Sequence, residues 1–188
     1  MKDYIDRYLE ETRNIIDSID RNKILEAANI LAGLRKNRGR LFFLGVGGSA
    51  ANASHSVNDF RKIAGIECYT PVDNVAELTA WTNDNGFEFV FINWLKTSRL
   101  TKNDAVFVLS VGGGSETVSR NLVLAMRYAK ETGAKIVSIV SRNGGVARDL
   151  SDACILVPVV NDERITPHAE GWQSVLCHLL VNSITASE

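Results

Sequence analysis

The residues best suited to chemistry lie in and after the segment 41–60, LFFLGVGGSAANASHSVNDF. An apolar run ends in glycines and Ser49, and small residues then begin a helix. Such a turn leaves backbone N–H groups free at the positive end of the helix dipole, where they can bind a phosphate, and the Ser49 hydroxyl adds a donor. Tight packing of strand on helix is the alternative explanation, since the turn has neither the lysine nor the spacing of a P-loop.

Side chains that could act as acid, base or ligand follow on the same predicted helix. His55 and Asp59 are four residues apart and therefore share a helix face. On the predicted closing helix, Glu170 and His178 lie within roughly 80 degrees of each other around the axis. The two pairs are the inventory of a divalent metal site or of an acid/base site, although His55 with Asp59 could be a solvated pair and His178 a core histidine. His168 either enters this site or caps the last helix.

A second glycine turn follows the apolar segment 104–111, where Gly112-Gly113-Gly114-Ser115 precedes a helix predicted for 116–132. Strand, glycine turn with serine, and helix thus occur twice in the chain. Because parallel strands place such turns at the same edge of a sheet, the two turns are expected to meet there. The repetition favours phosphate binding over packing alone.

The elements that must position these residues alternate along the chain. Nearly continuous apolar segments at 41–45, 104–111, 134–140 and 153–160, and a short one at 65–71, predict strands, and helical patterns separate them. This alternation predicts an α/β fold, a doubly wound parallel sheet flanked by helices. We expect one domain over 1–188, with an N-terminal helical pair in 1–38 that forms an oligomer contact and an α/β core in 39–188.

Composition restricts the class of protein further. A length of 188 residues, 45% hydrophobic, suffices for one substantial core. The net charge of −1 argues against a nucleic-acid partner. The N-terminus has no signal-peptide pattern and no run approaches a membrane span, so a cytoplasmic protein with no membrane partner is expected. Three scattered cysteines, Cys68, Cys154 and Cys177, are expected to be reduced core thiols.

Taken together, the motifs GVGGSAANASHSVNDF, LTAWTNDNGFEFVF and LSVGGGS and the closing helix with its histidines resemble the sugar isomerase (SIS) domain family. Within that family the chain is most similar to the phosphoheptose isomerases, and the resemblance covers nearly its whole length. It implies an aldose-ketose isomerase that converts sedoheptulose 7-phosphate to D-glycero-D-manno-heptose 7-phosphate through an enediol. It also implies a homotetramer whose sites are built at subunit interfaces.

The same resemblance assigns roles to individual residues. It implies phosphate binding by Ser49, Ser110 and Ser115 with the backbone amides of Gly47, Gly48, Gly113 and Gly114, and sugar contacts from Asn52 and from Asn83 or Asp84. It implies one Zn²⁺ per subunit, held by His55, Asp59, Glu170 and His178. Proton transfer would fall to His178 and Asp59, with Glu170 as the alternative carboxylate.

Several positions depart from the family pattern. Asp59 stands where the best-known members have Glu, and Glu170 where they have Gln. Val46 replaces an Asn, and Val111 and Gly112 stand where the usual pattern has Thr and Ser. These changes bear on the substrate but keep the ligand types, because Asp and Glu both bind zinc.

Other functions remain open at this point. An SIS domain can bind a phosphosugar or a partner without catalysis, although such a module has no need of two histidines and two carboxylates. The substrate could also be a hexulose or pentulose phosphate. A dehydrogenase is disfavoured because neither glycine turn has the dinucleotide spacing.

Overall fold

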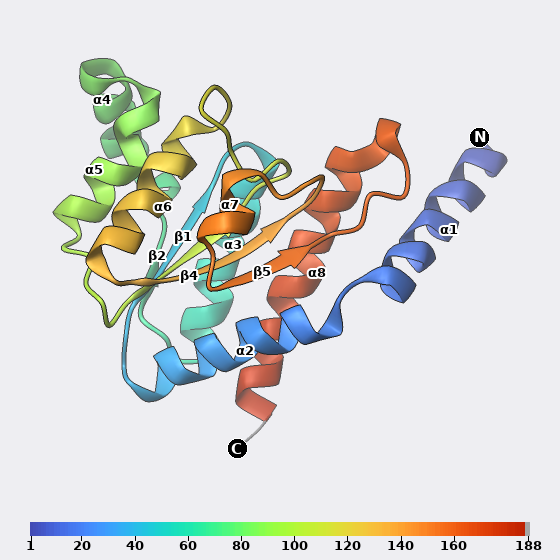
Figure 1. The fold of residues 1–188 in the computed structure, drawn as a ribbon, viewed down its shortest axis with the longest axis horizontal. Helices are drawn as coiled ribbons and strands as arrows, with labels where there is room; N and C mark the ends of the chain where they lie inside the picture. Colours follow the sequence, from blue (N-terminus) through green and yellow to red (C-terminus); the bar gives the residue numbers. More distant parts are fainter. Residues whose placement is uncertain (187–188) are drawn as a thin grey trace.

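The protein has an α/β architecture, seen here in a computed structural model that describes residues 1–186 (Figure 1). Five parallel strands form one sheet in the order β2-β1-β3-β4-β5. The strands are β1 (Leu41–Gly45), β2 (Cys68–Tyr69), β3 (Ala105–Leu109), β4 (Lys135–Val140) and β5 (Ala153–Leu156). The helices are α1 (Lys2–Ser18), α2 (Arg21–Lys36), α3 (Gly48–Lys62), α4 (Val75–Asn85), α5 (Val90–Thr97), α6 (Arg120–Thr132), α7 (Gly145–Leu150) and α8 (Ile165–Ala186), with short 3-10 turns η1 (Pro71–Asp73), η2 (Phe87–Phe89) and η3 (Asp162–Arg164). The predicted doubly wound parallel sheet is confirmed.

Helices cover both faces of the sheet, which explains why its strands are apolar throughout. α2, α3 and α8 lie on one face, and α5, α6 and α7 on the other (Figure 1). Alternate residues of β1 supply the two cores: Phe43 packs with Phe60 of α3, and Phe42 packs with Trp94 of α5. Side chains alternate across a strand, so a strand that is buried on both sides carries no polar face.

The cysteines are free thiols, as expected. Burial raises the pKa of Cys68 and of Cys177 to about 12, so both are unreactive core residues at neutral pH. Within residues 1–186, no helix has the length and apolar character needed to cross a membrane.

Helix α6 begins later than the sequence pattern predicts, at Arg120 instead of residue 116. The Ser115 hydroxyl accepts the backbone N–H groups of Thr117 and Val118, which closes a tight turn. Ser119 then takes a left-handed conformation with φ of 52°. These local bonds compete with the first turn of the helix.

Helix α1 extends from the body of the protein and buries only Glu11 and Ile15 (Figure 1). Glu11 fastens it to the start of α8, since its carboxylate accepts hydrogen bonds from Asn161 and Arg164 and lies 2.8 Å from the Nε2 atom of His168. The position of His168, left open by the sequence, is therefore in this buried ion-pair network. The rest of α1 exposes large apolar side chains, namely Tyr4, Ile5, Leu9 and Ile16.

Candidate functional site

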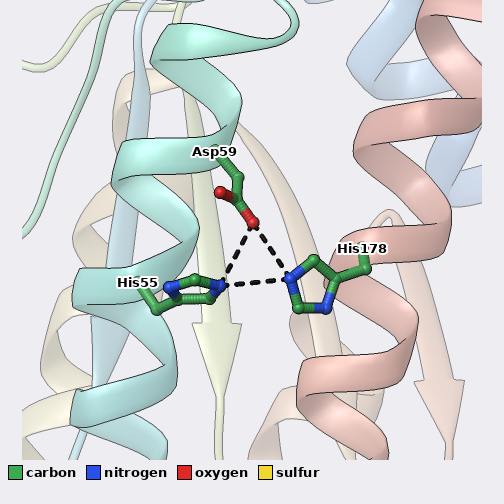
Figure 2. A group of neighbouring side chains, drawn as sticks. All are labelled: His55, Asp59 and His178. Atoms are coloured by element: carbon green, nitrogen blue, oxygen red, sulfur yellow. Dashed lines mark hydrogen bonds and ion pairs between the residues drawn. The ribbon is translucent and has the colours of Figure 1, made fainter.

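Three of the predicted acid, base or ligand residues converge between α3 and α8 (Figure 2). The Nε2 atom of His55 lies 3.3 Å from the Oδ2 atom of Asp59, and the Nε2 atom of His178 lies 3.1 Å from the same oxygen. The two Nε2 atoms are 3.1 Å apart. A helix turn brings His55 beside Asp59, and the packing of α3 against α8 brings His178 to both.

Side-chain hydrogen bonds hold α3 and α8 in register. The side-chain N–H groups of Asn52, on α3, donate to the backbone oxygen of Glu170 at 2.9 Å and to the Oε1 atom of Gln173 at 3.1 Å. Gln173 is fully buried in α8. The Asn52 amide, predicted to contact the sugar, therefore serves to align the two helices.

The three donor atoms are spaced as the ligands of one metal ion would be. Donor atoms bound tetrahedrally to Zn²⁺ at about 2.0 Å lie about 3.3 Å from one another. The three separations here, 3.1 to 3.3 Å, match that geometry. Two imidazole nitrogens and one carboxylate oxygen are also a donor set that suits zinc. The arrangement fits a divalent metal ion. Histidine and aspartate are also residue types that transfer protons in enzymes.

The group is open on one side. The side chains of His55 and His178 are 54% and 48% exposed, whereas that of Asp59 is 14% exposed. Structural zinc sites are usually closed by four protein ligands, whereas catalytic sites keep a position for water or substrate. The exposure therefore favours a site that receives a further ligand.

Glu170 does not join this group, contrary to the predicted set of four ligands. Its carboxylate lies against Gly48, where a Cβ atom would collide with it. The eight residues between Glu170 and His178 give a rise of about 12 Å along the helix, which the angular argument from the sequence omitted. The N-terminus of α3 is a favourable place for this carboxylate because the helix dipole is positive there.

The two glycine turns meet in one pocket of about 500 Å³ at the carboxyl ends of β1, β3 and β4. Four of the predicted phosphate-binding residues line it, namely Ser49, Ser110, Gly114 and Ser115. This is the edge of a parallel sheet, at the point where strand order reverses, at which α/β proteins bind ligands. Both turns are therefore placed as the repeated motif predicts.

The two turns differ in the donors that they offer. Ser49 is in the first turn of α3, where the helix leaves backbone N–H groups without intrahelical partners. In the second turn, the Gly113 N–H donates to the Ser110 Oγ atom and the Ser115 N–H donates to the backbone oxygen of Val118. The Gly113 amide, predicted to bind phosphate, is thus already engaged.

Asn83 and Asp84 lie away from the pocket, at the exposed end of α4. The Asn83 side chain donates to the Oδ1 atom of Asp84 at 2.7 Å. α4 buries no residue of its own and stands on the far side of the sheet from α8 (Figure 1). Within one chain these two residues do not reach the pocket, so their sugar contacts stay a prediction.

The pocket also contains residues that the sequence reading missed. The loop after β4 contributes Arg142, Asn143 and Gly145, and Thr166 reaches in from the start of α8. A sequence signal for this loop exists: the apolar segment 134–140 is followed by Arg142-Asn143-Gly144-Gly145. Because the carboxyl ends of parallel strands meet at one edge of the sheet, this loop is expected beside the two glycine turns.

An open parallel sheet that carries such a pocket is typical of α/β proteins that bind phosphorylated ligands. Residues 4–141 match the model of the SIS domain family, and the chain belongs to this family. It is 31% identical over 195 residues to a phosphoheptose isomerase of Nitratiruptor sp., with 100% of both chains covered. It is 34% identical over 148 residues to the lincomycin biosynthesis protein LmbN of Streptomyces lincolnensis, of which it spans only 52%. The solved structure of the phosphoheptose isomerase GmhA from Neisseria gonorrhoeae shares the fold, with a TM-score of 0.83, 21% identity and coverage of 98% and 96%.

Proposed function

We propose that the chain is an aldose-ketose isomerase that converts sedoheptulose 7-phosphate to D-glycero-D-manno-heptose 7-phosphate. The observation that carries the proposal is the arrangement of α3. This helix begins at the pocket with Ser49 and carries His55 and Asp59 further along, facing His178. The similarity to a phosphoheptose isomerase over the full length supports the same reaction.

The spacing along α3 suits a long sugar phosphate. Ser49 and His55 are six residues apart, a rise of about 9 Å along the helix. A phosphate held at the first turn would let an extended sugar chain reach the His/Asp/His group with its C1 and C2 end. Binding of the remote phosphate then orients the reacting carbons.

The reaction moves a proton between C1 and C2. From the ketose, a base removes a proton from C1 while the C2 carbonyl oxygen gains one, which gives the enediol; the O1 hydroxyl then loses its proton and C2 gains one. We assign these transfers to the Asp59 carboxylate and the His178 imidazole, acting through atoms other than the Oδ2 and Nε2 atoms that would hold a metal ion. Glu170, whose carboxylate lies against Gly48 at the start of α3, is the alternative carboxylate.

We further propose that His55, Asp59 and His178 hold one Zn²⁺ per subunit. When bound, the ion supplies Lewis acidity for the negative charge that develops on the sugar oxygens. The half-exposed histidines leave that face open toward substrate.

A homotetramer is part of the same proposal. α1 presents exposed Tyr4, Ile5 and Leu9, and α4 buries no residue within its own chain. Both would gain burial against other copies of the chain. A cytoplasmic location follows from the proposed substrate, since sugar phosphates are metabolites of that compartment.

The test measures zinc content and isomerase activity on sedoheptulose 7-phosphate, before and after chelation, in the wild type and in the His178→Ala variant. Activity should fall with the metal and return with added zinc, and His178→Ala should be folded and inactive. An active His178→Ala enzyme would overturn the assignment of His178, and a wild type without activity on any sugar phosphate would overturn the isomerase proposal.

A further inference from the structure

We propose that Arg142 binds the phosphate group of the substrate and supplies the positive charge that neutralises it. The inference rests on the proposed function in that it takes the ligand to be a phosphorylated sugar. It adds a specificity-determining residue from the loop after β4, outside the two glycine turns.

The charge of the pocket comes from one residue. Of the residues that line it, only Arg142 has a charged side chain, and the others are serines, glycines, threonine, asparagine and valines. A phosphate monoester carries a charge of about −1.5 to −2 at neutral pH. Hydroxyl and amide donors can solvate this charge, but Arg142 is the pocket residue that can balance it.

Several backbone N–H groups near Arg142 already donate hydrogen bonds within the protein. The N–H groups of Gly113 and Ser115 bond within their own turn. Those of Val146 and Ala147, at the start of α7, donate to the carbonyls of Gly114 and Gly113 at 3.0 Å. The glycine loop after β3 therefore offers fewer free backbone N–H groups to a bound anion than its sequence indicates. Binding of a phosphate here then depends more on a positively charged side chain.

The Arg142 guanidinium is also without a partner in the described part of the chain. Within residues 1–186 its guanidinium makes no hydrogen bond, ion pair or ring contact. By contrast, Arg40 pairs with Asp104, and Arg164 pairs with Glu11. An arginine that lines a pocket and pairs with no carboxylate is free to form a bidentate contact with phosphate oxygens.

The backbone of Arg142 is held in an unfavourable conformation by the loops around it. Its φ is 55°, in the left-handed region that a residue with a side chain rarely adopts. The Ser141 N–H donates to the Val111 oxygen, and the Gly144 N–H donates to the Ser141 oxygen, both at 2.9 Å. These bonds fix the loop on the second glycine turn, and a Cβ atom on Gly112 would lie 3.9 Å from the Arg142 Cδ atom.

The chain offers a matched control in Arg99. It is also an exposed arginine with positive φ, 52°, but it follows α5 at the opposite edge of the sheet and lines none of the pocket. Asn tolerates left-handed φ better than other residues do, so Arg142→Asn and Arg99→Asn remove the charge without imposing a new backbone strain. Arg142→Lys keeps the charge but loses the planar pair of donors.

The experiment measures binding of inorganic phosphate and of sedoheptulose 7-phosphate by calorimetry, with thermal unfolding of each variant. Arg142→Asn should weaken binding of both ligands about 10- to 100-fold, as expected for hydrogen bonds to a charged group. Arg142→Lys should fall between this variant and the wild type, and Arg99→Asn should bind as the wild type does. The melting temperature of Arg142→Asn should stay the same or rise, because the strain is relieved.

Unchanged binding in Arg142→Asn, an equal loss in Arg99→Asn, or no phosphate binding by the wild type would overturn the proposal. Phosphate binding can be measured without turnover. If the wild type has no isomerase activity but Arg142→Asn still loses phosphate affinity, the proposed reaction is overturned and the role of Arg142 is not. An active enzyme should show the loss as a lower kcat/KM, through a higher KM and, because the phosphate also orients the reacting carbons, a lower kcat.

Discussion

The Oδ2 atom of Asp59 lies 3.1 Å from the Nε2 atom of His178, although the two residues come from different helices, α3 and α8. The Nε2 atom of His55 approaches the same oxygen at 3.3 Å (Figure 2). Asp59 is therefore the point at which both helices converge. Removing the side chain of His55, Asp59 or His178 should therefore weaken binding of a metal ion to this group.

The first prediction concerns metal content. His55→Ala should lower zinc affinity at least about 100-fold, since replacing even an outer-shell partner of a ligand costs up to that much. Zinc is measured by competition with a chromophoric chelator. Val175→Ala, at an exposed position one turn before His178 on α8, is the control and should bind zinc normally. Equal zinc affinity in the two variants would contradict the metal assignment.

A second prediction addresses the acid stability of the α1 anchor. The hydrogen bonds from Arg164 and then His168 hold the pKa of Glu11 well below its usual value. A lowered carboxyl pKa stabilises the fold above the pKa of the unfolded state, about 4.3, and this stability is lost as the pH falls below it. Wild-type stability should therefore decrease from about pH 5 downward.

Glu11→Gln should be less stable than the wild type at pH 7 and should lose less stability on acidification. Denaturant unfolding at pH 7 and pH 4 measures both effects. Glu10→Gln is the control, because among residues 1–186 the side chain of Glu10 forms only an exposed ion pair with Arg13. If Glu10→Gln flattened the pH dependence as strongly, the network around Glu11 would not be its source.

Much of this arrangement could be predicted from the sequence, because it depends on strong local patterns. Continuous apolar segments specified a sheet that is buried on both faces, and the repeat of glycine turn and serine placed Ser49 and Ser115 in one pocket. The i, i+4 spacing of His55 and Asp59 places these two members of the His/Asp/His group side by side on α3.

The errors have physical causes too. The angle around the helix axis groups Glu170 with His178, but the rise of the helix over eight residues separates them by about 12 Å. The family resemblance implies that the Gly113 amide helps to bind phosphate, but this amide donates to the Ser110 hydroxyl oxygen within its own turn. Arg142 lies in an exposed loop with no periodicity, so its place in the pocket follows only from the way the strands assemble.

A third prediction uses the carboxylate that the structure places at the start of α3. Glu170 lies against Gly48, beside the proposed phosphate site, and should repel an incoming anion. Glu170→Gln should therefore strengthen binding of inorganic phosphate about two- to fivefold, the effect of a single charge near a helix terminus. Calorimetry measures it, with Glu163→Gln on the exposed η3 turn as control. Weaker phosphate binding in Glu170→Gln would show that the carboxylate assists the ligand.

Glu170→Ala then tests the fourth ligand position. Because the carboxylate lies outside the His/Asp/His group, this variant should keep its zinc affinity within about threefold of the wild type, the scatter expected for an outer position. The chelator competition described for His55→Ala gives the comparison. A loss as large as that of His55→Ala would place Glu170 among the ligands after a change of rotamer.

The last prediction tests the contact between the second glycine turn and the loop that carries Arg142. Gly145 has φ of 50°, and a Cβ atom there would collide with the carbonyls of Gly112 and Gly114. Gly145→Ala should destabilise the protein by about 1 to 3 kcal/mol, the cost of a side chain forced into such a conformation, and should weaken phosphate binding as the pocket opens. Gly171→Ala is the matched control, since Gly171 lies inside α8 and, within residues 1–186, the new Cβ would meet no atom within 4 Å beyond its own turn of helix and its chain neighbours. It should stabilise the protein by about 0.5 to 1 kcal/mol through helix propensity and leave phosphate binding unchanged. Denaturant unfolding and calorimetry separate the two variants, and a tolerated Gly145→Ala with normal phosphate affinity would mean that the two loops need not touch for the pocket to work.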